Sequence, residues 1–332
     1  MIYLAAAGRK LHYALFQIWS AFHWLVGHAR RLRRYVRKSW AGADPLCDSR
    51  MQAVYVHYDK KGMIHNYVLK QLEALLEAGF RTTFVSNSPQ FPEKNVAELA
   101  PFCRQILWRQ NVGYDFGAYK DGISAIGALD RVERLLLMND SVYGPFCPLD
   151  KVLGAIDATN TDLWGITDSW QHHYHIQSYF ILFLPNAIQS PTFRRFWRHL
   201  PYVNWKSWVS HKSELKLTQV FTQRKLRAKV LVPYWDVAML VLKKLEDLPS
   251  DLPAVHRDYL DRIHRLLVQG TPMNAPHVFW ETLLTDFSCP FLKREVITAN
   301  PVKVPFIWRW EEVVTRVSNY DPDLIRQHLQ AL

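Results

Sequence analysis

Short apolar runs separated by helical patterns constrain the fold of this chain more than any other feature. The runs are "QAVYVH", "RTTFVS", "RQILW" and "RLLLM", which begin at Gln52, Arg81, Arg104 and Arg134. Between the first two runs, apolar residues recur at helical spacing from Ile64 to Leu76, and Gly79 ends that pattern. Strands that alternate with helices predict an α/β fold, with a mostly parallel sheet and helices on both faces.

Polar residues follow these runs, where each predicted strand ends. In an open parallel sheet, ligands bind outside the carboxyl ends of the strands. We therefore expect one cleft at this edge, lined by Asp59, Ser86, Asn87, Asn111 and Asp140.

A glycine-spaced loop, "NVGYDFGAYKDG", precedes the helix between the third and fourth runs. Gly113 and Gly117 allow positive φ or a close approach of the backbone to a ligand, although such spacing more often means close packing. Asp115 between them can accept hydrogen bonds from sugar hydroxyls or cap the helix. The chain has neither a G-x-G-x-x-G motif nor a G-K-[ST] motif, so this loop matches neither a dinucleotide fingerprint nor a P-loop.

Asp140 follows an apolar run that we expect to be buried, and Tyr143-Gly144-Pro145 then turns the chain away. A lone aspartate at a strand end is often only a helix cap. A carboxylate in this position can also hold a divalent cation against a diphosphate.

Two further segments carry candidate groups for the cleft. In "HHYHIQSYF", His173 and His175 alternate, so that on a strand they share one face with Gln177 and Tyr179. No third zinc ligand stands nearby, which favours a cleft-lining role for this face over a metal site. For His172 the competing interpretation is a core histidine satisfied by hydrogen bonds.

Glu214 lies near the start of a predicted helix in "SELKLTQ". It is either a cap at the positive end of the helix or a general base aimed into the cleft, and the sequence leaves both open. Asp168, in "LWGITDS", is the second choice for the base.

The N-terminal arm carries most of the basic charge. Residues 1–50 contain nine Lys/Arg against two Asp/Glu, whereas the rest of the chain contains 32 against 28. Because the rest of the chain is so close to neutral, a nucleic-acid partner is not favoured.

An apolar stripe runs from Leu11 to Val36, and its second half carries six cations within residues 30–38. This pattern predicts an amphipathic helix over residues 11–38. We expect it to lie on the inner membrane surface, with packing against the protein's own core as the alternative. Residues 11–27 are shorter than a usual membrane span, and if they do span the bilayer, the basic residues after them still place the body in the cytoplasm.

The four cysteines, Cys47, Cys103, Cys147 and Cys289, form no C-x-x-C pair and no metal-ligand spacing. We expect buried thiols in a reducing compartment.

Several stretches between residues 52 and 305 together resemble the rhamnan synthesis protein F family, glycosyltransferases of bacterial polysaccharide and lipopolysaccharide assembly. The stretches are "VHYDKKG", "FVSNS", "NVGYDFGAYKDG", "LMNDSVYGPF", "LWGITDS", "HIQSYFILF", "SELKLTQ", "NAPHVFWETLL" and "CPFLKREVITANP". The resemblance implies a GT-A-like fold and transfer of a hexose, often rhamnose from a thymidine-diphosphate donor, to a growing glycan. It does not cover the N-terminal arm.

The resemblance also implies roles for individual residues. The nucleotide and donor sugar would contact Asp59, Ser86, Asn87, Asn111, Gly113, Asp115, Gly117 and Asn139. His175, Gln177 and Ser178 would shape the donor–acceptor cleft, and Glu214 would be the catalytic base. Asp140 would hold Mg²⁺ or Mn²⁺, yet Asn139-Asp140-Ser141 has one carboxylate where the family motif has two, which puts a tightly held metal in doubt. Lys293 and Arg294 would instead neutralise the diphosphate, or be ordinary surface charges.

The domain organisation follows from these segments. We expect a membrane-associating helix and linker in residues 1–50, the glycosyltransferase domain in 51–305 and a helical tail in 306–332. Two other functions remain open. One is a non-catalytic sugar-nucleotide-binding scaffold of a membrane-bound assembly complex. The other is a metal hydrolase that uses His173, His175 and Asp140.

Overall fold

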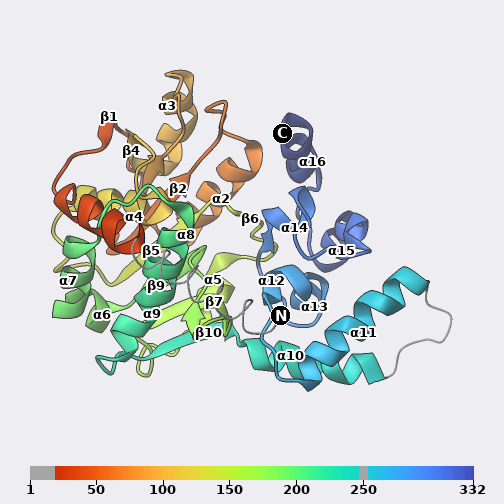
Figure 1. Ribbon diagram of the computed structural model, residues 1–332. Helices are drawn as coiled ribbons and strands as arrows, with labels where there is room; N and C mark the ends of the chain where they lie inside the picture. Colours follow the sequence, from red (N-terminus) through yellow and green to blue (C-terminus); the bar gives the residue numbers. More distant parts are fainter. Residues whose placement is uncertain (1–18, 247–252) are drawn as a thin grey trace.

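The computed structural model describes residues 19–246 and 253–332, and its centre is one twisted sheet (Figure 1). The strands of this sheet run in the order β1-β4-β3-β2-β5-β9-β7-β10, and β8 pairs with β7 at one end. Their bounds are β1 Val36–Ala41, β2 Met51–His57, β3 Arg81–Ser86, β4 Cys103–Arg109, β5 Arg134–Asn139, β7 Leu163–Ser169, β8 His175–Ile176, β9 Phe180–Phe183 and β10 Ala228–Val232. A separate antiparallel pair joins β6 Val142–Tyr143 to β11 Leu292–Lys293.

The four apolar runs form β2, β3, β4 and β5, which pair in parallel. β10 and β7 are also parallel, whereas β1 and β9 run antiparallel to their neighbours. The predicted fold class is therefore confirmed: the protein is α/β, with a mixed, mostly parallel sheet flanked by helices.

Helices cover both faces of the sheet. Their bounds are α2 Asn66–Glu77, α3 Lys94–Leu99, α4 Tyr114–Ile126, α5 Leu149–Gly154, α6 Pro185–Gln189, α7 Pro191–His199, α8 Lys206–Val209, α9 Leu215–Thr222, α10 Tyr234–Glu246, α11 Ala254–Val268, α12 Ala275–Val278, α13 Trp280–Thr285, α14 Arg294–Thr298, α15 Trp310–Val317 and α16 Asp323–Ala331. A π-helical turn, Ser210–Glu214, joins α8 to α9. Because successive side chains of a strand alternate, Tyr55 packs into the core that contains α2, and Val54 and Val56 pack into the core that contains α4.

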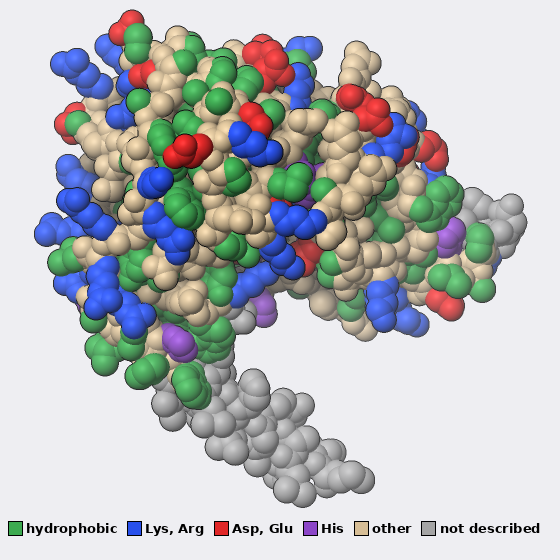
Figure 2. Space-filling view, turned by 90° about the horizontal axis from the view of Figure 1, so that it is seen from above, with side chains coloured by type: hydrophobic (Ala, Val, Ile, Leu, Met, Phe, Trp, Pro, Cys, Tyr) green, Lys and Arg blue, Asp and Glu red, His purple; other side chains and the backbone are tan. Residues whose placement is uncertain are grey.

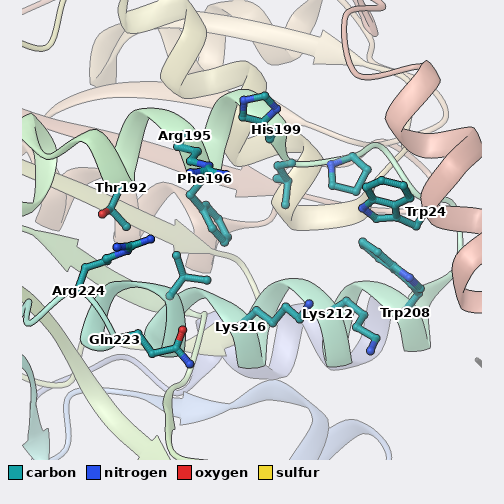
Figure 3. A pocket seen from close by; sticks show the side chains of 13 residues that line it. Trp24, Thr192, Arg195, Phe196, His199, Trp208, Lys212, Lys216, Gln223 and Arg224 are labelled. Carbon is teal, nitrogen blue, oxygen red and sulfur yellow. The ribbon is translucent and has the colours of Figure 1, made fainter.

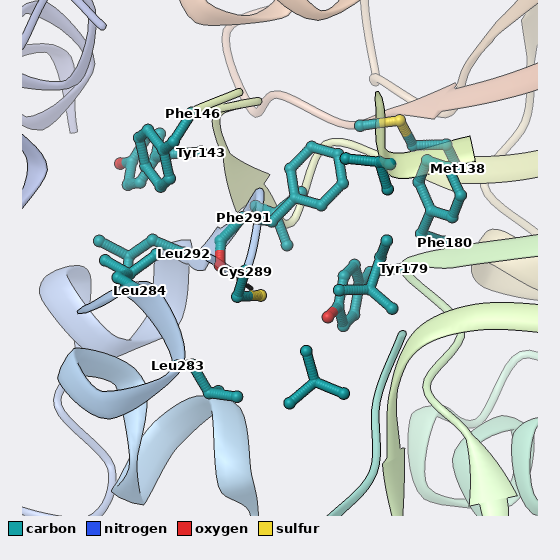
Figure 4. Close-up of a cluster of buried hydrophobic side chains, with 14 of the residues drawn as sticks. Met138, Tyr143, Phe146, Tyr179, Phe180, Leu283, Leu284, Cys289, Phe291 and Leu292 are labelled. Carbon is teal, nitrogen blue, oxygen red and sulfur yellow. Dashed lines mark hydrogen bonds between the residues drawn. The ribbon is translucent and has the colours of Figure 1, made fainter. Parts of the chain in front are cut away.

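A buried aromatic and aliphatic cluster joins the C-terminal part of the chain to the sheet (Figure 4). The Phe291 ring centroid lies 5.6 Å from that of Phe180 and 6.3 Å from that of Tyr179. This contact brings β11 against β6 and so carries Lys293 and Arg294 to the end of β5.

The expected helical tail also packs back on the body. The Tyr143 hydroxyl lies 2.7 Å from Nδ1 of His328 on α16, and Asn66 Nδ2 donates to Gln327 Oε1 at 2.7 Å.

The N-terminal arm differs from the expected single helix. The described part is helical only over residues 19–29, and residues 11–18 lie outside the described chain. Val36–Ala41 is a strand, β1, which pairs with β4, so the helix predicted through residue 38 is wrong at its end. The backbone of β4 offers hydrogen bonds to this segment, and that long-range pairing overrides its local helical spacing.

The helix at residues 19–29 turns its large hydrophobic side chains away from the protein. Trp19, Phe22 and Leu25 are each more than half exposed, whereas Ser20 and Gly27 are buried. A Cβ on Gly27 would meet the Tyr202 carbonyl oxygen at 2.8 Å, so the helix docks through its small residues. Hydrophobic side chains gather beside Lys and Arg at the lower left of Figure 2, where this helix lies. Core packing of the apolar stripe, the alternative for this arm, is therefore not observed for Phe22 and Leu25, whereas Val36 at the end of the stripe packs against the core.

Within the described residues, no helix has both the length and the apolar character needed to cross a bilayer.

All four cysteines are free thiols. Cys103 and Cys289 are buried as expected, but Cys47 is exposed and Cys147 is only partly buried. The expectation of four buried thiols is therefore wrong for these two residues.

Candidate active site

The loops that follow β2, β3, β4 and β5 meet at the carboxyl edge of the sheet, because these strands are parallel. Backbone hydrogen bonds tie the loops together. The Asn87 amide donates to the His57 carbonyl at 2.8 Å, and the Asp140 amide donates to the Val56 carbonyl at 3.0 Å. The polar residues at the strand ends thus share one edge.

Asp115 lies at this edge because the chain turns sharply between β4 and α4. Gly113 precedes the helix with φ at 81°, a left-handed conformation that glycine adopts without strain. Asp115 is the second residue of α4, and its Oδ2 accepts a hydrogen bond from Asn139 Nδ2 at 3.1 Å. The glycine loop and the end of β5 therefore contribute to one site.

Three carboxylates and one lysine influence each other here, and we call Asp115, Asp140, Glu214 and Lys293 the acid–lysine cluster. Burial, with the Asp140 and Glu214 carboxylates, raises the pKa of Asp115 to about 6, and Lys293 opposes that rise. Burial lowers the pKa of Lys293, while Glu214 and Asp115 oppose that change. Contacts support their proximity, because Asn139 Nδ2 donates to Asp115 and Lys293 Nζ donates to Ser141 Oγ, on either side of Asp140.

Glu214 reaches the cluster from the end of the π-helical turn. Its Oε1 accepts hydrogen bonds from Ser178 Oγ at 2.7 Å and from the Ser178 amide at 3.3 Å. Ser178 is positioned in turn by Tyr119 of α4, whose hydroxyl donates to the Ser178 carbonyl at 3.0 Å. No side-chain bond caps α9, so the interpretation of Glu214 as a simple helix cap is not supported.

Asp140 has a cationic partner, Arg294. Its Oδ2 lies 3.2 Å from Arg294 Nη1 and accepts from the Tyr58 amide at 3.2 Å. Arg294 also hydrogen-bonds the Tyr67 hydroxyl. Burial opposes the charged form of Arg294, but Asp140 and Tyr67 raise its pKa, so it stays a cation. Arg294 is only partly exposed, and so it is not an ordinary surface charge.

Lys293 lies beside Arg294 and faces the same edge. Its Nζ donates to Ser141 Oγ at 3.1 Å and lies 4.5 Å from the centre of the Tyr179 ring. Two cations from β11 and α14 therefore flank the Asn139-Asp140-Ser141 turn.

The Asn139-Asp140-Ser141 turn offers a single carboxylate to a metal ion. In residues 19–246 and 253–332, no group of three or more His, Cys, Asp or Glu side chains is placed to hold a metal ion. The Asp140 carboxylate is already paired with Arg294, and His173, His175 and Asp140 form no such group.

Sequence reasoning missed Arg109, a fully buried cation at the end of β4. Its Nη1 donates to Asn87 Oδ1 at 2.6 Å, and its Nε donates to Asp121 Oδ2 at 2.6 Å. Its place directly after the run "QILW" was the sequence signal that could have indicated a buried cation at the strand end. Arg109 thus positions Asn87, a predicted donor contact, and joins β3 to α4.

Several predicted residues are engaged outside the acid–lysine cluster. The Asp59 carboxylate accepts from the Lys61 and Met63 amides, each at 2.8 Å. The Gln177 side chain bonds Thr167 and Asn274. The Asn111 amide oxygen is buried without a hydrogen-bond partner. The proposed donor and acceptor roles of these residues remain predictions.

The expected strand that would align the histidines does not form. β8 covers only His175 and Ile176, and His173 lies in a bend before it with its carbonyl bound to His175 Nδ1 at 2.8 Å. His172 is exposed, so the interpretation as a core histidine is wrong. Asp168, the second choice for the base, accepts from the Tyr234 amide at 2.6 Å and so binds the start of α10.

Cavities of about 360 to 500 Å³ elsewhere in the described chain have linings that do not include the acid–lysine cluster.

The family model described as "Rhamnan synthesis protein F" matches residues 82–240 and confirms the predicted resemblance. The uncharacterized protein y4gN of Sinorhizobium fredii (strain NBRC 101917 / NGR234) is 30% identical over 231 residues, which are 67% of this chain and 59% of that protein. Virulence protein VirA of Vibrio anguillarum (strain ATCC 68554 / 775) is 28% identical over 245 residues, 70% of this chain and 76% of that protein. The chain thus spans less than two thirds of the first relative.

Similar solved structures include GlyE of Streptococcus pneumoniae TIGR4, described as a glycosyltransferase, with a TM-score of 0.38 and 10% identity over 86% of this chain and 64% of that one. TarS of S. aureus has a TM-score of 0.34 and 12% identity over 79% and 53%. The bifunctional glycosyltransferase WbbM has a TM-score of 0.30 and 11% identity over 57% and 40%. At these TM-scores, the likeness supports no conclusion about mechanism.

Proposed function

We propose that this protein is a glycosyltransferase of cell-surface polysaccharide or lipopolysaccharide synthesis. The premise is the match of residues 82–240 to rhamnan synthesis protein F. It transfers a hexose from a nucleotide-diphosphate donor to a growing glycan. The observation that carries this proposal is that hydrogen bonds hold Asp115, Glu214 and Lys293 at the carboxyl edge of the sheet, through Asn139, Ser178 and Ser141 respectively. That edge is where open α/β sheets bind nucleotides and their sugars.

The departing diphosphate gains negative charge in the transition state, and preorganised cations stabilise that charge. Lys293 and Arg294 supply two positive charges, and Asp140 and Tyr67 hold Arg294 in place. In this proposal Asp140 is a positioning residue.

The acceptor hydroxyl must lose its proton as it attacks the sugar. Glu214 is the proposed general base, because Ser178 fixes its Oε1 and the described residues place no hydrogen-bond donor on its Oε2. Direct attack on the donor inverts the configuration of the sugar. Asp115, bound to Asn139, accepts hydrogen bonds from the donor's hydroxyls. Thymidine-diphosphate rhamnose is the donor that the family resemblance favours.

The first test of this mechanism is Glu214→Gln, which keeps the shape of the side chain and its bond to Ser178 but removes the base. We expect the transfer rate to fall about 10²- to 10⁴-fold while donor binding persists. Glu98→Gln, at an exposed glutamate of α3, is the matched control. Transfer by the Glu214 variant at the wild-type rate would move the base elsewhere, with Asp168 the next candidate.

Nucleotide sugars should also protect the protein against thermal unfolding. Selective protection by thymidine-diphosphate rhamnose would identify the donor, and comparison with and without chelator would show whether a divalent ion contributes. The second candidate function is the non-catalytic scaffold, which the ion pair of Asp140 with Arg294 favours because it engages that carboxylate. Donor protection without turnover of any acceptor glycan would establish that function instead.

The protein also belongs, in this proposal, at the inner face of the cell membrane. The outward-facing Trp19, Phe22 and Leu25 and the arginines that follow them suit the boundary between headgroups and acyl chains. This surface would hold the enzyme beside a lipid-linked glycan acceptor.

A further inference from the structure

A cavity of about 410 Å³ lies between α7 and the segment that contains α8 and α9 (Figure 3), and its lining includes no residue of the acid–lysine cluster. α7 and α9 pack against each other through contacts that include Phe196 and Phe221. Trp24 reaches the cavity from the N-terminal helix, residues 19–29, and Trp208 lines it from α8 (Figure 3).

The lining of this cavity carries charge of a single sign. Arg195, Lys212, Lys216 and Arg224 contribute four cations, and the lining contains no Asp or Glu. None of the four takes part in an ion pair with any residue of the described chain. Cations gathered without a counter-charge favour an anionic ligand, and their mutual repulsion decreases when one binds.

A buried donor in the same cavity also lacks a partner. The Trp208 side chain is buried, and its indole Nε1 forms no hydrogen bond. A buried polar group of this kind is costly unless something accepts its hydrogen, and a phosphate oxygen can do so. The four cations are therefore the groups that the cavity surface offers to an anion, and the unpaired Trp208 indole lies in the same lining residue set.

The position of the cavity indicates the source of the anion. Trp24 belongs to the helix whose other aromatic side chains, Trp19 and Phe22, face solvent. Continuity between an exposed aromatic surface and a basic cavity is suited to an amphipathic ligand, which has an anionic head and an apolar tail.

We propose that this cavity binds the phosphate group of an anionic membrane lipid, whose acyl chains lie along the exposed aromatic face of residues 19–29. The lipid is not the reacting substrate at this site. Lys212 and Lys216 lie two residues on either side of Glu214, and Glu214 faces Ser178. Residues two apart on a helix point to opposite faces, so this segment presents one face to the lipid and the other to the acid–lysine cluster.

The test uses the full chain and a triple variant, Arg195→Ala with Lys216→Ala and Arg224→Ala. These side chains are exposed and unpaired, so their loss leaves the fold intact, which thermal unfolding verifies. The control variant, Lys229→Ala with Lys243→Ala and Arg265→Ala, removes the same charge from exposed positions outside the cavity. Both are mixed with phosphatidylcholine vesicles that contain phosphatidic acid.

We expect the cavity variant to bind these vesicles at least about tenfold more weakly than the control variant, because cations close to an anionic headgroup contribute most. Equal losses in the two variants would overturn the proposal in favour of general electrostatic attraction. A second arm compares soluble short-chain phosphatidic acid with inorganic phosphate. The lipid should raise the unfolding temperature of the wild type but not of the cavity variant. Equal protection by inorganic phosphate would show a free-anion site and refute the lipid assignment.

Discussion

Asp115 is the residue whose ionisation most directly reports the state of the site. In the folded protein its pKa is about 6, against an ordinary value of 3.8, because it is buried near Asp140 and Glu214. The folded state therefore holds a proton that the unfolded state has already lost between these two pH values. The stability that this proton contributes is fully present below pH 3.8 and is lost as the pH rises through about 6.

The substitution Asp115→Asn removes this titration but keeps an acceptor for Asn139. We expect the free energy of unfolding of the variant, relative to wild type, to increase as the pH rises from about 4 to about 7. Chemical denaturation at several pH values measures this. Asp261→Asn, at an exposed carboxylate without an ion pair in the described chain, is the control. A difference independent of pH would mean that Asp115 is not held near the other carboxylates.

At the scale of elements, the junction of β4 with α4 shows how the glycine loop positions the site. A Cβ on Gly117 would meet the Val112 carbonyl oxygen at 2.4 Å and Arg109 Nη2 at 3.2 Å. The spacing Gly113-x-x-x-Gly117 thus allows close packing of the first turn of α4 on the chain before it. This packing also presents Asp115 at the sheet edge, so the structural and functional interpretations of the loop are compatible.

Gly117→Ala should destabilise the protein by about 1–3 kcal/mol, because a backbone oxygen stands where the methyl group must go. Gly154→Ala is the matched control: Gly154 ends α5, and nothing lies within 4 Å of its added Cβ. Denaturant unfolding measures both, and the control should change stability little or raise it slightly. If both variants were equally stable, the close approach at Gly117 would not constrain α4.

At the scale of the whole molecule, the site depends on a contact between distant parts of the chain. Lys293 and Arg294 lie at the end of β5, and the packing of Phe291 beside Tyr179 and Phe180 helps to hold them there (Figure 4). The buried cluster around Phe291 is therefore as necessary to the site as the charged groups themselves.

Phe291→Ala should lower the free energy of unfolding by about 3–5 kcal/mol, because it leaves a cavity in this core. It should also weaken donor binding, since Lys293 follows two residues later. Trp308→Ala, at a side chain that is 70% exposed, is the control and should cost about 0.5 kcal/mol or less. Donor affinity unchanged in a folded Phe291 variant would show that the two cations are positioned by other contacts.

The sequence by itself predicted the alternation of strands and helices, the sharp turn at the glycine loop and the polar ends of β2 to β5. These features depend on local periodicity and on residues with special backbone freedom, such as Gly113, and both can be read from short segments. Motifs within those segments also carried the resemblance to rhamnan synthesis protein F.

Only the tertiary structure decided which charges meet. Sequence spacing does not show that Arg294 pairs with Asp140, that Arg109 is buried against Asn87, or that β1 completes the edge of the sheet. It also did not determine which face of residues 19–29 is exposed, because an amphipathic stripe has the same spacing whether it packs on a core or faces outward. These ion pairs, strand pairings and exposed faces depend on contacts between residues far apart in the chain, and local sequence patterns do not predict such contacts.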